Sequence, residues 1–347
     1  MLFEGSMGLL GVVTAITYEL DEMSYARYHP KISSSSMTDL LPPPGTDIPP
    51  ETVERLQHYY SEFIQYLGYN GDPGVLWLYT FQNDGRAEDA TVIIDELENA
   101  FQEDLLFLNQ VGETLFQTIL EHYNADEYLY WVFGWITGKA AAFAMPDFDT
   151  SITTTVTEAM HFRRGLHYLI VRAAELIVPI PLLDNGEYDF RIVQEVVHDM
   201  KRVHDDFVSR GLHPVDYAFE ARMMSGSELY MSSQYGNSAS LAIEVAASPL
   251  IPEHVWVDFK NALASNWRNY KDKDGQPLRV RPHWAKEFPL EVGGQDIYDY
   301  MREIYQDQIP LFVEGFNNIM ARTNGNVTHT INMFSTKYLD KIFEGYF

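Results

Sequence analysis

The sequence contains no cysteine, and this absence excludes disulfide bonds, thiolate catalysis and cysteine-ligated metal sites. Basic residues are few, because 24 Lys and Arg stand against 50 Asp and Glu and give a formal net charge of −26. A surface of this sign repels nucleic-acid phosphates and anionic lipid headgroups, so we expect no nucleic-acid partner. No stretch approaches the roughly 18 uninterrupted apolar residues of a membrane span. We therefore expect a soluble chain, in a compartment that the sequence leaves undecided.

Several motifs of metal and nucleophilic catalysis are also missing. The histidines form no H-E-x-x-H pattern, and His198 and His204 lie six positions apart on one predicted helix, which puts them on different faces. We therefore expect no metal site. The sequence has no G-x-S-x-G elbow, no Walker A loop and no G-x-G-x-x-G.

The 347 residues are 46% hydrophobic and 14% aromatic, which is enough for a substantial core in two domains or one large α+β body. The composition of residues 31–50 predicts a surface loop or linker. After it we expect a helix over residues 52–67 and a buried strand over 75–81. Helices are expected over 90–110 and 112–123, followed by an apolar aromatic stretch at 128–145.

From residue 170 onward the pattern predicts one module of the form β-α-β-β-α-β. Its expected strands and helices, in chain order, are 176–180, 189–210, 217–224, 238–246, 252–267 and 279–284. This order is typical of a ferredoxin-like split arrangement, in which helices cover one face of an antiparallel sheet. A helix over 297–321 and an apolar tail are expected to follow. The predicted fold class is therefore α+β.

The sequence opens on a glycine-rich turn, Gly5-Ser6-Met7-Gly8-Leu9-Leu10-Gly11, that leads into an alternating strand from Val12 to Leu20. Glycines let the backbone approach a cofactor closely, and their N–H groups can meet phosphate oxygens. Such a turn is a weak signal by itself. A domain rarely begins inside this kind of unit, so we expect further sequence to belong before it.

Two segments carry polar groups that could perform chemistry. On a predicted strand, Glu220 and Arg222 lie two residues apart and so project from the same face, where they form either a solvent-facing pair or a carboxylate and guanidinium facing a pocket. In Arg281-Pro282-His283-Trp284-Ala285-Lys286, polar and aromatic groups crowd a strand end. Lys286 there could stabilise developing negative charge and His283 could transfer a proton, or the segment could simply be a strand end with a surface cation.

Together these segments resemble the vanillyl-alcohol-oxidase-type FAD flavoproteins, in their sugar-1,4-lactone and alditol oxidase branch, which includes D-arabinono-1,4-lactone oxidase. The glycine turn is similar to the last turn and strand of the flavin domain. Phe219-Glu220-Ala221-Arg222 with the turn at 232–237 resembles the central strand, and the hexapeptide resembles R-P-H-W-G-K with Ala285 in place of Gly. The resemblance covers the second half of the chain and residues 1–20, whereas residues 21–160 match only loosely.

The resemblance implies a set of roles. Glu220 and Arg222 would bind substrate hydroxyls and orient the carbon that is oxidised, with Tyr235 and Trp284 also at the substrate. Lys286 would lie near the flavin, and His283 would support the pocket. FAD would be contacted by Gly5, Ser6, Gly8, Gly11 and Val12. Hydride transfer from a sugar lactone or polyol, with reoxidation by O₂, would yield hydrogen peroxide.

The resemblance also implies a domain division, and the sequence differs from the family pattern in two respects. Residues 1–20 would be a remnant of the FAD domain, 21–160 a helical insertion with the first part of the cap, 161–290 the substrate-binding cap, and 291–347 a helical tail. The FAD-attachment region is missing, so tight FAD binding would need a separate N-terminal chain or fragment. The strand beside Glu220, which is often polar in the family, offers the apolar Leu241 and Ile243 here.

Three functions therefore stay open. The chain is the substrate-binding part of a FAD-dependent oxidase, a polyol-binding or protein-interaction module that has lost FAD, or a structural subunit whose exposed apolar seam pairs with another chain.

Overall fold

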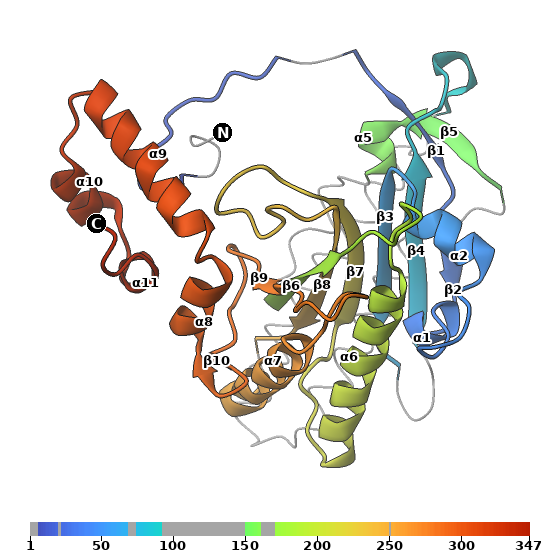
Figure 1. Ribbon diagram of the computed structural model, residues 1–347. Coiled ribbons are helices and arrows are strands. Elements are labelled where there is room, and N and C mark those ends of the chain that lie inside the picture. Colours follow the sequence, from blue (N-terminus) through green and yellow to red (C-terminus); the bar gives the residue numbers. More distant parts are fainter. Residues whose placement is uncertain (1–5, 20–21, 69–73, 92–149, 161–170, 250) are drawn as a thin grey trace, which may run out of the picture.

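The computed structural model describes residues 6–19, 22–68, 74–91, 150–160, 171–249 and 251–347. Its centre is a nine-stranded sheet with the order β5-β1-β4-β3-β7-β8-β6-β9, in which β2 also pairs with β4 and every pairing is antiparallel (Figure 1). The strands are β1 (Tyr25–Tyr28), β2 (Lys31–Ser33), β3 (Tyr60–Tyr66), β4 (Val75–Gln82), β5 (Ile152–Thr155), β6 (Arg172–Ile180), β7 (Ala218–Ser225), β8 (Ala239–Ala247) and β9 (Arg281–Pro282).

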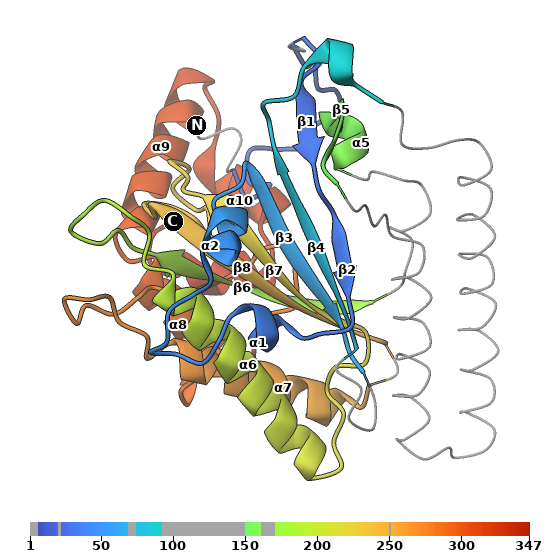
Figure 2. The ribbon, with the colours of Figure 1, turned by 90° about the vertical axis from the view of Figure 1, so that its right-hand side faces the viewer.

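Two long helices cover one face of this sheet, α6 (Arg191–Ser209) and α7 (Glu253–Trp267) (Figure 2). Apolar residues recur at helical spacing along α6 and form a continuous buried stripe. That stripe and the aromatic side chains of α7 pack against alternate residues of β8, so one side of the strand lies in the main core. The other side of the strand is free to carry polar groups.

The other α-helices of the described residues are α1 (Met37–Leu40), α2 (Pro50–Leu56), α5 (Val156–Ala159), α8 (Ile297–Ile304), α9 (Gln308–Arg322), α10 (Val327–Phe334) and α11 (Lys337–Ile342). They vary in length, and α9 is as long as α7. A two-stranded ribbon of β10 (Glu291–Val292) and β11 (Gln295–Asp296) leads into α8. The helices α8 to α11 lie beyond the β9 side of the sheet (Figure 1).

The expected antiparallel sheet with helices is confirmed, and most predicted elements after residue 170 lie within a few residues of the observed ones. One predicted helix, over 297–321, is divided into α8 and α9, because residues 305–307 interrupt it. The predictions over 90–110, 112–123 and 128–145 lie outside the described residues, except for residues 90 and 91.

Three predictions in the first part of the chain are wrong. Residues 52–67 form the short helix α2 and then β3, because the aromatic run that begins at Tyr60 pairs with both β4 and β7. The segment 31–50, predicted as a surface loop, contains β2 and α1 and buries Met37 and Leu41 in the main core. Residues 12–19 form no strand, and Val12 and Val13 are exposed.

Candidate functional site

Single carboxylates interrupt otherwise apolar strands at the centre of the sheet. Glu220 of β7 pairs in register with Glu244 of β8, which pairs with Glu175 of β6. Paired residues on neighbouring strands share a face, so the three carboxylates form a row across three strands. On β3, Glu62 pairs with Arg222, whose side chain shares the face of Glu220 because the two lie two residues apart. This face is the one opposite α6 and α7.

Two cations hold the carboxylates together. Arg222 forms an ion pair with Glu220, and its Nε and Nη2 atoms lie 3.6 Å from Glu62 Oε1 and 3.7 Å from Glu244 Oε2. Lys286 reaches the same group from beyond β9, with its Nζ 2.8 Å from Glu244 Oε1. We call these six side chains, Glu62, Glu175, Glu220, Glu244, Arg222 and Lys286, the carboxylate cluster. The three residues predicted to act together, Glu220, Arg222 and Lys286, are thus brought together through Glu244.

The cluster has more acids than bases in a largely desolvated place. Glu175, Glu62 and Glu244 have side-chain exposures of 4%, 8% and 10%, whereas Glu220 retains 23% and Arg222 31%. Burial, followed by repulsion from Glu244, raises the pKa of Glu175 to about 7. Burial, followed by repulsion from Glu62, raises the pKa of Glu220 to about 8. The cluster therefore holds an exchangeable proton near neutral pH.

Two further groups border the cluster. His283 lies with Nδ1 4.0 Å from Glu175 Oε2, and burial together with the charge of Lys286 lowers the pKa of His283 below its ordinary value. The imidazole is therefore neutral at pH 7 and able to accept a proton. On the other side, the Tyr60 hydroxyl donates to Glu62 Oε2 at 2.6 Å. This bond orients Glu62 toward Arg222.

The raised pKa values predict how stability depends on pH. Glu175 and Glu220 bind protons more tightly in the folded chain than at the ordinary value of 4.5, so the folded state holds more protons between about pH 4.5 and 8. The free energy of unfolding should therefore fall by several kcal/mol as pH rises through this window, because each pKa unit of difference between the folded and unfolded states corresponds to about 1.4 kcal/mol. Urea denaturation at pH 5.5, 7 and 8.5 measures this, and Glu220→Gln should make the profile flatter. A profile that Glu220→Gln leaves unchanged would contradict the assignment.

A cavity of about 550 Å³ lies beside Lys286. Aromatic side chains line much of it, namely Trp284, Phe288, Tyr298 and Tyr338. Met7 of the N-terminal turn also contributes, so the cavity is bounded by the N-terminal turn, α7, the segment after β9, α8 and the start of α11. Of the carboxylate cluster, Lys286 lines this cavity, whereas Glu220 and Arg222 do not. Its volume lies in the range of small-molecule sites.

The residues expected to contact FAD do not all lie together in the structure. Gly5 lies outside the described residues, and Val12 is exposed at 79%. Ser6 and Gly8 belong to a turn in which the Ser6 carbonyl accepts a hydrogen bond from the Leu9 N–H at 3.0 Å. Gly8 and Gly11 have φ values of +76° and +127°, which favour glycine. Leu9 anchors this turn in the main core, and through Met7 the turn reaches the cavity that Lys286 also lines.

Of the two other predicted substrate residues, Trp284 faces the cavity and Tyr235 lies elsewhere. The Trp284 indole donates to the Met231 carbonyl at 2.6 Å, which fixes the ring in the cavity wall. Tyr235 lies on the connection between β7 and β8, where its carbonyl accepts a hydrogen bond from Arg281 at 2.9 Å. The structure therefore places Tyr235 beside the buried Arg281, to which its backbone carbonyl is hydrogen-bonded.

The sequence did not point to Glu62, Glu175 and Glu244. It also led to the wrong residues of β8 being placed beside Glu220 in the expected substrate pocket. Leu241 and Ile243 lie in the main core under the helices, so they are no part of the polar face. The residue of β8 beside Glu220 is Glu244, so β8 presents a polar residue on this face of the sheet. One signal was available, because each missed glutamate is the only acidic residue of a largely apolar strand.

Among the residues that the structure describes, no group of three or more His, Asp or Glu side chains is placed to hold a metal ion. Within the same ranges, no helix combines the length and apolar character of a bilayer span.

No protein-family model and no curated protein matches the sequence. Solved structures do match the fold. The chain is similar to cholesterol oxidase from B. sterolicum, with a TM-score of 0.58, 14% identity, and coverage of 92% of this chain and 60% of that one. A histidine-to-alanine mutant of the Brevibacterium sterolicum enzyme gives a TM-score of 0.59 at 15% identity, with the same coverage.

The chain therefore has a fold of mixed helix and antiparallel sheet that is similar to the fold of the cholesterol oxidases. It spans about three-fifths of the length of the cholesterol oxidases that it matches.

Proposed function

We propose that this chain is the substrate-binding part of a FAD-dependent oxidase that removes a hydride from a CH–OH group. The observation that carries the proposal is the carboxylate cluster, in which a proton-holding carboxylate and a fixed guanidinium lie together on the sheet face opposite the helices. The oxidase-like fold and the sequence resemblance to FAD flavoproteins add support. Bound FAD would supply the hydride acceptor.

Several residues of the cluster would have separate roles in the oxidation of an alcohol. Glu220 has a pKa near the working pH, which suits a group that accepts the hydroxyl proton as the C–H bond breaks. Arg222 is held by carboxylates and presents N–H donors that can orient the alcohol oxygen. Lys286 places a positive charge beside the cavity, where it can stabilise negative charge. His283, neutral at pH 7, supports this arrangement through Glu175.

The residues around the cavity fit a flat aromatic group such as the flavin ring. Trp284 and Phe288 form an edge-on aromatic pair with centroids 5.9 Å apart, and Tyr298 and Tyr338 form a tilted pair with centroids 6.0 Å apart. Aromatic walls of this kind bind planar rings by stacking and edge contacts. Ser6, Gly8 and Gly11 would hold the cofactor from the adjoining turn.

We further propose that tight FAD binding uses a polypeptide segment corresponding to the part of the cholesterol oxidases that this chain does not span. A separate N-terminal chain or a fragment would provide it. The exposed apolar residues Val12, Val13, Ile16 and Tyr18 offer a surface for such a segment. Intact mass and sequencing of every polypeptide that purifies with the chain, together with a flavin absorbance spectrum, test this proposal.

The substrate class has two candidates. The partly exposed pair of Glu220 and Arg222 favours a polyhydroxylated substrate, a sugar lactone or polyol, because the carboxylate can accept and the guanidinium can donate hydrogen bonds to neighbouring hydroxyls. An alcohol with an apolar body is favoured by the aromatic cavity wall and by the stacked pair of Trp77 and Tyr79, whose centroids lie 4.5 Å apart on the cluster's face of the sheet. Cholesterol, the substrate named for the structural neighbours, belongs to this second class.

Hydrogen peroxide release tests the function and separates these substrates. FAD-loaded chain is mixed with lactones, polyols and apolar alcohols, and peroxide is followed for wild type and Lys286→Met. We expect peroxide with one class only, and a fall of about tenfold or more in Lys286→Met, because the charge beside the cavity is lost. Peroxide at wild-type rate in Lys286→Met would contradict the role of Lys286. Polyol binding by calorimetry without any flavin would favour a binding module that has lost FAD.

A further inference from the structure

Lys286 needs an anchor, because its ammonium group reaches the cluster from an irregular segment rather than from a strand. The segment after β9 folds back on itself, with the Lys286 N–H donating to the His283 carbonyl at 3.1 Å. The next residue, Glu287, makes the attachment. Its backbone N–H donates to the Ala173 carbonyl of β6 at 2.9 Å.

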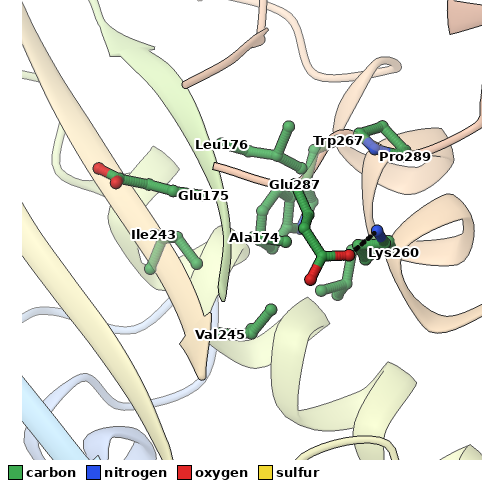
Figure 3. A pocket seen from close by; sticks show the side chains of 10 residues that line it. Ala174, Glu175, Leu176, Ile243, Val245, Lys260, Trp267, Glu287 and Pro289 are labelled. Atoms are coloured by element: carbon green, nitrogen blue, oxygen red, sulfur yellow. Dashed lines mark hydrogen bonds and ion pairs between the residues drawn. The ribbon is translucent and has the colours of Figure 1, made fainter. Parts of the chain in front are cut away.

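The Glu287 carboxylate is the centre of a hub that joins three parts of the fold. Arg172 of β6 donates two hydrogen bonds to it, at 3.0 and 2.8 Å. From α7, the Trp256 indole donates at 2.9 Å and the Lys260 ammonium at 3.0 Å. Figure 3 shows the Glu287–Lys260 contact facing a small pocket between β6, β8 and α7, while the Glu175 side chain points away from it.

The hub keeps the Glu287 carboxylate ionised. Partial burial works to raise the pKa of Glu287, but hydrogen bonds from Arg172, Trp256 and Lys260 outweigh it and lower the pKa to about 2. Lys260 is only 5% exposed and depends on Glu287 as its counterion. Since Glu287 is covalently joined to Lys286, the hub limits where the Lys286 backbone can lie.

We propose that Glu287 is a positioning residue that holds the Lys286 ammonium group against Glu244 and so sets the proton affinity of the carboxylate cluster. The use of this positioning in catalysis rests on the proposed function. The contacts from which we infer it are made within the chain and do not depend on that function. Without the hub, Lys286 would move away from Glu244 and its positive charge would no longer favour ionised Glu175 and Glu220.

The sign of a pKa change separates positioning from a direct charge effect. Removing the charge of Glu287 through space alone would lower the pKa of nearby carboxyl groups, because one repelling charge is lost. Release of Lys286 would raise the pKa of Glu175 and Glu220, because an attracting charge is lost. The other groups facing these carboxyls are Tyr60, Glu62, Tyr66, Arg222, Glu244 and His283, and they are the same in every variant of the test.

The experiment follows the carboxyl ¹³C signals of Glu175 and Glu220 through a pH titration of the intact chain, without cofactor or substrate. The variants are wild type, Lys286→Met, Glu287→Gln and Lys286→Met/Glu287→Gln. A further variant, Lys260→Met/Glu287→Gln, removes the buried cation together with its counterion, so it keeps the fold if Glu287→Gln alone does not.

We expect both pKa values to rise by about half a pKa unit or more in Lys286→Met. Glu287→Gln, or Lys260→Met/Glu287→Gln, should reproduce most of this rise, and Lys286→Met/Glu287→Gln should add little to it. The proposal is overturned if the Glu287 variants leave the titrations unchanged or lower the pKa values, if the effects of Lys286→Met and Glu287→Gln simply add, or if Lys286→Met itself has no effect. A chain that passes this test but releases no peroxide would disprove the oxidase function alone.

Discussion

Alcohol oxidation is expected to fall by about a hundredfold when Glu220 is replaced by Gln, because the amide cannot accept the hydroxyl proton. Gln keeps the size of the side chain, so substrate binding should change much less than kcat. In the wild type, the rate should rise with pH up to about 8, as Glu220 loses its proton and becomes a base. This rise should be absent in Glu220→Gln. Steady-state peroxide release between pH 6 and 9 measures both effects.

The matched control is Glu314→Gln, which changes an exposed carboxylate on α9. It should leave both the rate and its pH profile unchanged. Equal losses in Glu220→Gln and Glu314→Gln would point to a general charge effect, and an unchanged rate in Glu220→Gln would remove the proposed base.

The largest loss of stability is expected when Arg222 is replaced by Met. Arg222 contacts Glu62, Glu220 and Glu244, so its removal leaves buried carboxylates without their main counterion. Breaking a fully buried ion pair in this way costs about 3–5 kcal/mol, and since Arg222 is partly exposed we expect about 2–3 kcal/mol at pH 8.5. At pH 5.5 the loss should be smaller, because Glu175 and Glu220 are then protonated and need no counterion. Urea denaturation at the two pH values measures the difference.

Arg302→Met provides the comparison for this loss. Arg302 forms a surface ion pair of 3.4 Å with the exposed Glu344, and such pairs contribute less than about 1 kcal/mol. A loss for Arg222→Met that is as small as that of Arg302→Met, or one that does not depend on pH, would show that Arg222 does not neutralise the cluster.

The core of the sheet could be predicted from the sequence where one local pattern allowed only one structure. The strand β8 and the helix α6 were predicted nearly at their observed bounds, because a short apolar run and a long amphipathic stripe differ in length and period. The strand β6 begins four residues before its predicted start at residue 176. The strand β3 was not predicted. Leu56, Tyr60, Phe63, Ile64 and Leu67 also fit helical spacing, and only pairing with strands distant in the sequence selects the extended form.

The carboxylate cluster was predictable in part. Glu220, Arg222 and Lys286 could be predicted to lie together because they belong to short motifs that resemble known oxidases, and the structure brings them together around Glu244. Glu62 and Glu244 belong to no motif, and their place beside Arg222 depends on strand order and register, which the sequence does not state. The apolar Leu241 and Ile243 were assigned to the pocket for the same reason, since the face of β8 that turns toward the helices follows from its pairing.

Anaerobic reduction of bound flavin tests the central claim most directly, because it isolates hydride transfer from reoxidation. FAD-loaded chain, with any polypeptide that accompanies it, is mixed with the alcohol that gives peroxide, and the absorbance of oxidised flavin is followed in a single turnover. The account predicts that the flavin is bleached in the wild type and about a hundredfold more slowly in Glu220→Gln. Flavin that stays oxidised with every alcohol, or that is bleached equally fast in Glu220→Gln, would contradict it.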